Sequence, residues 1–312
     1  MTAPARGQLK GYLTVALCAV CWASGGLMAK WVFERLGLSV QPLTLAAVRS
    51  FVAFPLLFGY CALTRRSVLR LAPRDIPFVA SFGVFALALM HFTYFKAIQE
   101  TNVATALLLQ YTAPVLVLIV SVLFLRERLT WALPLSVVLA LLGCALTVGV
   151  MGGAGLMVSG AGIAWGLASA GFMTVYIIMG KLAVGRIASW TLATYGLGAA
   201  ALFWAVFLTV RGGFSDVGVL LGSLKGCLAV LAIAVVSTVV PFALFLQALT
   251  VVDATKASVT AMLEPAVAAL GAYLLLGENL TALQILGGAL LLTAILVIHV
   301  PVFQREPLPP AA

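Results

Sequence analysis

The chain has 312 residues, of which 63% are hydrophobic and 9% charged, with a mean hydropathy of +1.18. Because soluble domains carry about 25% charged residues, this composition excludes a water-soluble globular fold and indicates a membrane protein. The net charge of +9 comes from short clusters between apolar segments. No basic stripe or aromatic platform outside the apolar runs indicates nucleic-acid binding.

Apolar runs divide the chain into ten predicted transmembrane helices of about 20 residues each. The first run follows two cationic residues, as in a signal peptide, but it is longer than a typical signal sequence and is kept as a span. The loops are short, so no soluble domain is inserted, and the Pro-rich segment 304–312 is predicted to be a disordered tail. In chain order the predicted spans are 11–31, 42–63, 77–98, 103–125, 131–150, 159–180, 188–210, 225–249, 255–276 and 282–303.

An internal duplication relates the two halves of the chain. Residues 127–130 read Glu-Arg-Leu-Thr and residues 278–281 read Glu-Asn-Leu-Thr, an offset of 278 − 127 = 151. We therefore predict two repeats, 1–150 and 151–303, each with five spans. Five is an odd number, so the second copy enters the membrane inverted, an arrangement typical of transporters that work by alternating access. Further identical pairs at this offset are Pro114 and Pro265, Ala97 and Ala248, Ala106 and Ala257, Gly11 and Gly162, and Lys30 and Lys181.

The cationic residues lie mostly on one side of the predicted spans. With the N-terminus inside, twelve flank the inner ends and five the outer ends, and Arg49 lies within a span. The positive-inside rule therefore predicts that both termini are cytoplasmic. The inner set is Arg6, Lys10, Arg65, Arg66, Arg70, Arg74, Arg126, Arg128, Lys181, Arg186, Lys256 and Arg305, and the outer set is Lys30, Arg35, Lys96, Arg211 and Lys225.

Two related motifs resemble the signature of the EamA family of the drug/metabolite transporter superfamily. In the second half these are residues 263–265 (Leu-Glu-Pro) and, after an apolar helix, 276–281. The first half carries a weaker form at 112–114 (Thr-Ala-Pro) and 125–130, and residues 47–51 resemble the Arg-containing second helix of the family. The resemblance covers nearly the whole chain. It implies ten helices and metabolite export across the bacterial inner membrane, and the chain is most similar to exporters of aromatic and other amino acids.

Three prolines are predicted to act as hinges within spans. Pro114 and Pro265 are equivalent, whereas Pro241 has Met90 as its counterpart. Proline removes a backbone donor and clashes with the preceding turn, so each helix should kink or loosen. Each site is either a hinge beside a central cavity or a static kink that shapes the bundle.

Two charged residues lie deep within predicted spans, where burial costs roughly 2.5–3.5 kcal/mol. Glu264 is a candidate substrate-binding residue, as a proton site or a contact for an ammonium group. Its alternative role, which the pattern slightly favours, is a structural acceptor that ties its helix to a neighbour. The first half has Ala113 at this position, so any role of Glu264 is asymmetric. Arg49 either meets a substrate carboxylate or pairs internally, and the structural role is favoured.

Aromatic and polar side chains complete the candidate substrate-binding set. His91 and Tyr94 are three residues apart and share a helical face, where Tyr111 of the next span can join them. Trp22 and Trp165 lie too deep for the interfacial aromatic belt, so they either line an aromatic-binding cavity or pack between helices. The alternative for His91 is a hydrogen-bonded packing residue.

The predicted function is a secondary transporter that exports amino acids with aromatic or large apolar side chains. No catalytic constellation, P-loop or metal cluster occurs in the sequence, so we expect neither an enzyme nor a cofactor. The expected partners are a small-molecule substrate and membrane lipids, and the arrangement is compatible with a monomer. Alternatives are an exporter of another small amphiphilic metabolite or drug, a lipid-modifying enzyme and a non-transporting scaffold. The slight preference for a structural Glu264 favours facilitated diffusion over proton coupling.

Overall fold

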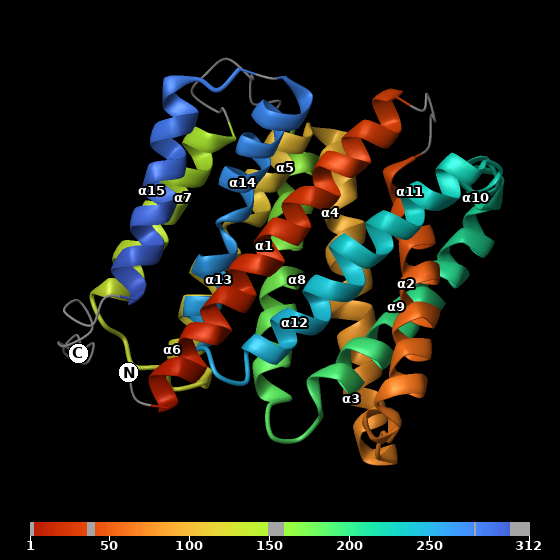
Figure 1. Ribbon diagram of the computed structural model, residues 1–312, viewed down its shortest axis with the longest axis horizontal. Coiled ribbons are helices and arrows are strands. Elements are labelled where there is room, and N and C mark those ends of the chain that lie inside the picture. The colour runs from red at the N-terminus through yellow and green to blue at the C-terminus, as the bar shows by residue number, and fades with distance from the viewer. Residues whose placement is uncertain (1–2, 36–40, 149–158, 278, 300–312) are drawn as a thin grey trace.

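The computed structural model describes residues 3–35, 41–148, 159–277 and 279–299, and every regular element in them is a helix. The helices form a single bundle (Figure 1). In the first half they are α1 (Ala3–Arg35), α2 (Pro42–Thr64), α3 (Ile76–Ser81), α4 (Leu89–Glu100), α5 (Val103–Gln110), α6 (Ala113–Phe124) and α7 (Ala132–Thr147). In the second half they are α8 (Gly160–Leu182), α9 (Ser189–Arg211), α10 (Phe214–Leu221), α11 (Leu224–Ala234), α12 (Val240–Ala248), α13 (Ala254–Ala261), α14 (Glu264–Gly271) and α15 (Ala282–His299).

Short non-α segments join several of these helices. Two single 3₁₀ turns, Arg66–Leu69 and Pro73–Asp75, lie in the connection between α2 and α3. Three π-helical segments continue longer helices: η3 (Phe82–Ala88) joins α3 to α4, η4 (Val235–Val239) joins α11 to α12, and η5 (Ala272–Leu276) extends α14.

Nine helical segments among the described residues are long and apolar enough to cross a membrane. They coincide with nine of the predicted spans. The predicted fifth span, 131–150, corresponds to α7, whose 16 residues measure about 24 Å against a hydrocarbon core of about 30 Å. The last two residues of this predicted span, and the predicted tail 304–312, lie outside the described residues. Exposed leucines, valines and phenylalanines cover the outside of the bundle, as lipid contact requires.

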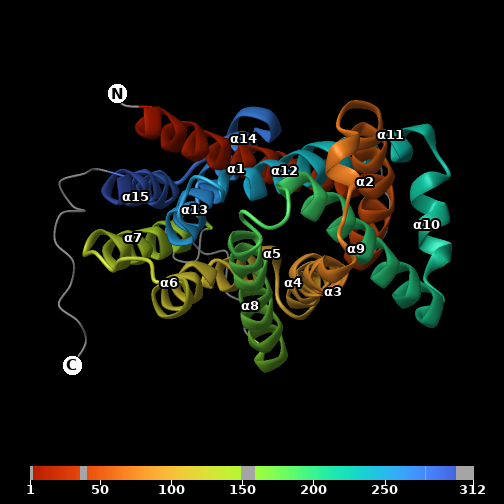
Figure 2. The same cartoon turned by 90° about the horizontal axis from the view of Figure 1, so that it is seen from below.

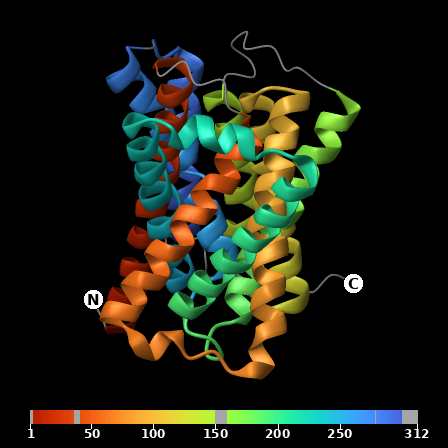
Figure 3. The same ribbon diagram turned by 90° about the vertical axis from the view of Figure 1, so that its right-hand side faces the viewer.

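Helices from the two halves interleave in the bundle. Helix α1 packs along α12, and its equivalent α8 packs along α4. Helices α7 and α15 pack together at one edge, while α2 and α9 pack together towards the opposite edge, beside the short α10 (Figures 1 and 2). Viewed from that opposite edge, α2 and α10 lie in front (Figure 3). Each of these pairs thus consists of one helix from the first half and one helix from the second half.

Helices α1 and α8 run in opposite directions. Val252, in the turn after α12, is the common reference point. A Cβ added to Gly11, near the start of α1, would lie 2.5 Å from Cγ2 of Val252. Lys181, at the end of α8, donates a hydrogen bond to the carbonyl of Val252 at 2.7 Å. The start of α1 and the end of α8 therefore lie at the same end of the bundle, as do the start of α1 and the end of α15 (Figure 1).

Candidate functional site

The predicted fourth and ninth spans are each interrupted near the middle. Helix α5 ends at Gln110 and α6 begins at Ala113, while α13 ends at Ala261 and α14 begins at Glu264. Pro114 and Pro265 stand in the first turns of α6 and α14, where the missing backbone donor costs nothing. The prolines thus begin new helices after a break in the hydrogen-bonded ladder. Movement at these breaks stays a prediction.

Tyr111 and Glu264 join the two breaks. The Tyr111 hydroxyl donates a hydrogen bond of 2.6 Å to Oε2 of Glu264. Tyr111 is 7% exposed, and it directly follows α5 whereas Glu264 begins α14, so the contact links the two halves of the chain. Oε1 of Glu264 has no hydrogen-bond partner in the described part of the chain. The carboxylate is therefore held by one oxygen and has the other available.

Arg49 of α2 and two residues of α4 are further polar groups on helices that pack against each other, and α4 also packs against α5. Cζ of Arg49 lies 6.0 Å from the ring centroid of Phe95, which lies 5.5 Å from that of Tyr94. Nδ1 of His91 lies 2.7 Å from the carbonyl of Leu87, so Nδ1 is the protonated nitrogen in the neutral ring. We call Arg49, His91, Tyr94, Tyr111 and Glu264 the polar cluster.

Trp22 reaches the polar cluster through an aromatic neighbour. Its ring centroid lies 5.8 Å from that of Phe242 and 5.5 Å from that of Phe245, both in α12. His91 lies 5.7 Å from Phe242 on the other side of that contact. Trp22, Phe242 and His91 therefore form a continuous aromatic surface next to the charged groups.

Trp165 lies in a different aromatic group. Its nearest ring is Phe92, at 5.9 Å between centroids, and Phe92 in turn contacts Trp204 and Phe207. These are ring contacts between α8, α4 and α9. Among the six predicted substrate-binding residues, Tyr111 and Glu264 are hydrogen-bonded, and Trp22 and His91 contact the same ring, Phe242. That these residues bind substrate stays a prediction. Phe242 is a member that the sequence did not single out, because nothing in its spacing separates it from the other phenylalanines.

Pro241 follows a π-helical segment rather than a sharp kink. The wider turn of η4 accommodates the proline ring in the first turn of α12. Ser237 in this segment donates to the carbonyl of Ile233 at 2.8 Å, and a Cβ on Gly25 of α1 would lie 2.1 Å from its Cβ. The third span has its own π-helical segment, η3, which ends at Ala88, the counterpart of Val239 (239 − 88 = 151). Both segments therefore lie at matched places in the two halves.

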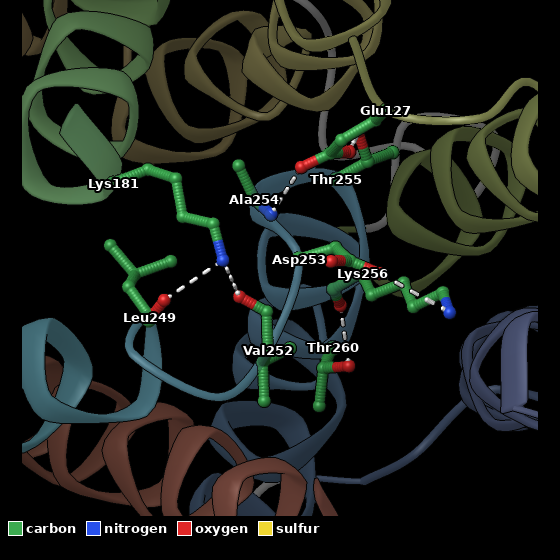
Figure 4. A network of polar contacts seen from close by, with 9 residues as sticks. All are labelled: Glu127, Lys181, Leu249, Val252, Asp253, Ala254, Thr255, Lys256 and Thr260. Carbon is green, nitrogen blue, oxygen red and sulfur yellow. Dashed lines mark hydrogen bonds and ion pairs between the residues drawn. The ribbon is translucent and has the colours of Figure 1, made fainter. Parts of the chain in front are cut away.

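A cavity of about 640 Å³ lies near the end of the bundle where α8 ends and α13 begins. Two charged residues on its wall organise the turn between α12 and α13 (Figure 4). Glu127 accepts 2.8 Å hydrogen bonds from the backbone of Ala254 and the hydroxyl of Thr255, which caps the start of α13. Lys181 donates to the carbonyls of Leu249 and Val252 at 3.0 and 2.7 Å and so caps the end of α12.

The polar cluster is not part of this cavity. The lining is cationic overall, and Arg126 within it has a left-handed backbone with φ of 56°, which is unfavourable for a residue with a Cβ. Its counterpart is Gly277, with φ of 72°. Glycine at the equivalent position of the second repeat is the feature of the sequence that indicates a left-handed backbone at residue 126. The lining residues are Leu125, Arg126, Glu127, Arg128, Thr130, Ala132, Leu133, Lys181, Val184, Asp253, Lys256 and Ile298.

The chain matches a family and several named proteins along nearly its full length. The model of the EamA-like transporter family matches residues 9–149 and again 160–300, two matches that begin 160 − 9 = 151 residues apart. An "Uncharacterized inner membrane transporter YicL" of Salmonella typhimurium is 26% identical over 95% of this chain and 97% of the relative. An "Uncharacterized transporter" of Archaeoglobus fulgidus is 32% identical over 82% of this chain and 86% of the relative.

A further relative carries a more specific name. The "Probable terminal-alkyne amino-acid exporter" of Streptantibioticus cattleyicolor is 26% identical over 93% of both chains. One solved crystal structure superposes with a TM-score of 0.78 at 20% identity, covering 95% of this chain and 98% of the other. At that identity the superposition shows the fold alone.

Proposed function

Because this chain belongs to the EamA-like transporter family, we propose that it is a secondary transporter that exports amino acids with aromatic or large apolar side chains by alternating access. The family and the names of the relatives indicate transport across a membrane rather than catalysis. The apolar helices make the chain a multi-pass membrane protein. We place it in the bacterial inner membrane, with both termini cytoplasmic.

The observation that carries the substrate class is the half-engaged carboxylate of Glu264. Tyr111 holds Oε2 at 2.6 Å, and Oε1 makes no hydrogen bond to a described residue. A carboxylate within a membrane span is costly unless a partner stabilises it, and charge-assisted hydrogen bonds are the strong ones. An ammonium group of the substrate supplies such a partner at Oε1. Tyr111 keeps the carboxylate oriented in the absence of substrate.

The aromatic neighbours of this carboxylate suit a large apolar side chain. Trp22, Phe242 and His91 present aromatic faces beside the polar cluster. A flat apolar group of the substrate gains area burial there and, when aromatic, about 0.5–1.5 kcal/mol per ring pair beyond it. The exporter from Streptantibioticus cattleyicolor, named for an amino-acid substrate, supports the same class.

The arrangement of the two halves supports alternating access. Equivalent helices make equivalent contacts, and α1 and α8 run in opposite directions. We infer from this two inverted five-helix repeats, 1–150 and 151–303, related by a pseudo-two-fold axis in the membrane plane. The interruptions at Pro114 and Pro265 and the π-helical turn before Pro241 serve as hinges. The 640 Å³ cavity, at the end expected to be cytoplasmic, serves as the entry for substrate.

Counterflow in proteoliposomes tests this function. Vesicles loaded with one unlabelled amino acid at a time should accumulate the labelled compound, most strongly for phenylalanine, tyrosine, tryptophan and leucine. Glu264→Gln should fold normally, because the amide oxygen still accepts from Tyr111. Its affinity should fall about tenfold or more, because the charge-assisted contact is worth about 1.5–3 kcal/mol. Near-normal counterflow in Glu264→Gln, together with unchanged gradient-driven accumulation, would instead assign a purely structural role to the carboxylate.

Other outcomes separate the alternatives. Counterflow of non-amino-acid amphiphiles alone indicates a different metabolite or drug as the substrate. Loss of pH-gradient-driven accumulation in Glu264→Gln, with counterflow retained, indicates that Glu264 carries protons. Product formation from added phospholipid indicates a lipid-modifying enzyme. No flux of any compound, with folding intact, indicates a scaffold.

A further inference from the structure

Arg49 is a partly buried cation without a counter-ion in the described structure. Its Nη2 atom is inaccessible to solvent and has no hydrogen-bond partner. The ion pairs that the described residues do form, Arg186 with Asp75 and Lys256 with Asp253, lie elsewhere. The internal partner that a structural role requires is therefore missing.

The immediate surroundings of Arg49 do not replace that partner. The nearest ring is Phe95, whose centroid lies 6.0 Å from Cζ of Arg49, at the outer limit of a cation–π contact. His91 already uses Nδ1 on the carbonyl of Leu87. A guanidinium with an unfilled donor in a membrane span costs folding free energy, so its retention points to a partner that arrives from outside the chain.

Resting on the proposed function, we propose that Arg49 binds the carboxylate of the transported amino acid, while Glu264 binds its ammonium group. Guanidinium and carboxylate match in shape and form two parallel hydrogen bonds, which an ammonium side chain cannot do. Each of these two partly buried charges of the protein then meets the opposite charge of one zwitterion. The site therefore takes zwitterionic α-amino acids in preference to amines or acids of the same size.

The positions of the neighbours fit this assignment. Arg49 approaches Phe95, whose ring contacts that of Tyr94, and Tyr94 also interacts electrostatically with Glu264. His91 lies on the same face of α4 and contacts Phe242, which contacts Trp22. A zwitterion held beside Tyr94 can direct its side chain to that aromatic surface. Arg49 then selects for the carboxylate, and Trp22 and Phe242 select for the side chain.

Three related probes test the assignment with the full-length protein in proteoliposomes. They are phenylalanine, phenylalaninamide, which lacks the carboxylate, and 3-phenylpropionate, which lacks the ammonium group. Competition against labelled phenylalanine gives the apparent affinity of each. The wild type should prefer phenylalanine to both analogues by tenfold or more. Arg49→Gln should lower the apparent affinity for phenylalanine by tenfold or more. Its apparent affinity for phenylalaninamide should stay within about twofold of the wild-type value.

Matched variants separate charge from geometry. Arg49→Lys keeps the charge without the planar pair of donors. Its apparent affinity for phenylalanine should therefore lie between those of the wild type and Arg49→Gln. Glu264→Gln should lower the apparent affinity for phenylalaninamide but not for 3-phenylpropionate, which is the opposite of the pattern expected for Arg49→Gln. Arg70→Gln removes an exposed arginine in the loop after α2 and should change none of the three affinities.

The outcomes distinguish this inference from the proposed function. Equal affinity of the wild type for phenylalanine and phenylalaninamide overturns the role of Arg49 even when Arg49→Gln does not fold. Equal losses of affinity for phenylalanine and phenylalaninamide in Arg49→Gln also overturn the role of Arg49. The proposal of amino-acid transport is not affected by that result. If no amino acid exchanges but a carboxylate does so in an Arg49-dependent way, the proposed function fails and the role of Arg49 holds. If neither amino acids nor carboxylates exchange, both fail.

Discussion

Gly162 and Thr101 approach so closely that no side chain fits between them: a Cβ on Gly162 would lie 2.2 Å from Cγ2 of Thr101. The contact joins the start of α8 to the end of α4. Gly11 and Val252, each 151 residues away from one of these two, make the equivalent contact at 2.5 Å. The repeat in the sequence is therefore also a repeat of a packing contact, and glycine permits the close approach in both places.

Gly162→Ala should destabilise the protein. The added methyl group overlaps Thr101, and such overpacking typically costs about 1–3 kcal/mol of the free energy of unfolding. Gly171→Ala is the matched control in the same helix, because its Cβ would meet nothing within 4 Å. The control should raise stability by up to about 1 kcal/mol through helix propensity. Thermal unfolding in detergent measures both, and equal stability of the two variants would contradict the close contact.

Tyr111→Phe should destabilise the bundle more than Tyr94→Phe. The first change removes the donor to Glu264 and leaves Oε2 buried without its partner, at a cost of about 1–3 kcal/mol. Tyr94 makes no hydrogen bond to a described residue through its hydroxyl, so the same change there removes little. Unfolding of the two purified variants in one detergent decides the order. A larger loss in Tyr94→Phe would mean that the Tyr111–Glu264 bond contributes little.

Glu127→Ala should loosen the turn between α12 and α13. The carboxylate satisfies the backbone donor of Ala254 and the hydroxyl of Thr255, and loss of a helix cap costs about 0.5–2 kcal/mol. Glu127→Gln retains one acceptor and should lose about half as much. Arg128→Ala, next to it and exposed, serves as the control. Faster backbone hydrogen exchange at the start of α13 in Glu127→Ala alone is the expected signature, and exchange unchanged from the wild type would argue against the cap.

Arg126→Gly should stabilise the protein by about 1 kcal/mol, because glycine adopts a left-handed backbone without the clash of a Cβ. Arg126→Ala removes the same charge and keeps the clash, so its stability should stay near that of the wild type. The difference between the two variants in chemical or thermal unfolding isolates the backbone effect. A stability for Arg126→Ala equal to that of Arg126→Gly would show that charge, not backbone conformation, decides.

Cysteine labelling should place both termini in the cytoplasm. A single cysteine introduced into 304–312, in a chain whose five native cysteines are replaced, should resist a membrane-impermeant maleimide in intact cells and react after lysis. A cysteine introduced between 212 and 223, expected at the outer face, is the positive control. Labelling of the tail from outside would contradict the predicted orientation of the C-terminus.

Much of the fold could be predicted from the sequence because lipid contact imposes long apolar runs. Nine predicted spans coincide with helical segments for this reason. The structural consequence of Pro114 and Pro265 was harder to predict. A proline inside an apolar run predicts a kink, but only the backbone hydrogen bonds show that each span divides into two helices, with Thr112 and Leu263 at the breaks.

The composition of the candidate site depended on contacts that no local pattern specifies. His91 and Tyr94 share a helical face by spacing, so their association with one site was accessible from sequence. Trp165 was placed in the same set on depth alone, and its ring contacts Phe92 of α4. Lys181 had a signal, its identity with Lys30 at the repeat offset. Its hydrogen-bond acceptors, however, are the backbone carbonyls of Leu249 and Val252 at the end of α12, and a side-chain pattern does not reveal backbone acceptors.

The hydrogen bond between Tyr111 and Glu264 also bears on how such a chain arose. Met262 stands where a second tyrosine would be, and Ala113 where a second acid would be (262 − 111 = 151 and 264 − 113 = 151). Two identical short subunits paired head to tail would carry tyrosine and glutamate at both breaks or at neither, and two facing carboxylates would repel. Once an ancestral gene was duplicated and fused, each copy could diverge alone. A single unshared acid in the membrane is thus a feature that a pair of identical subunits cannot have.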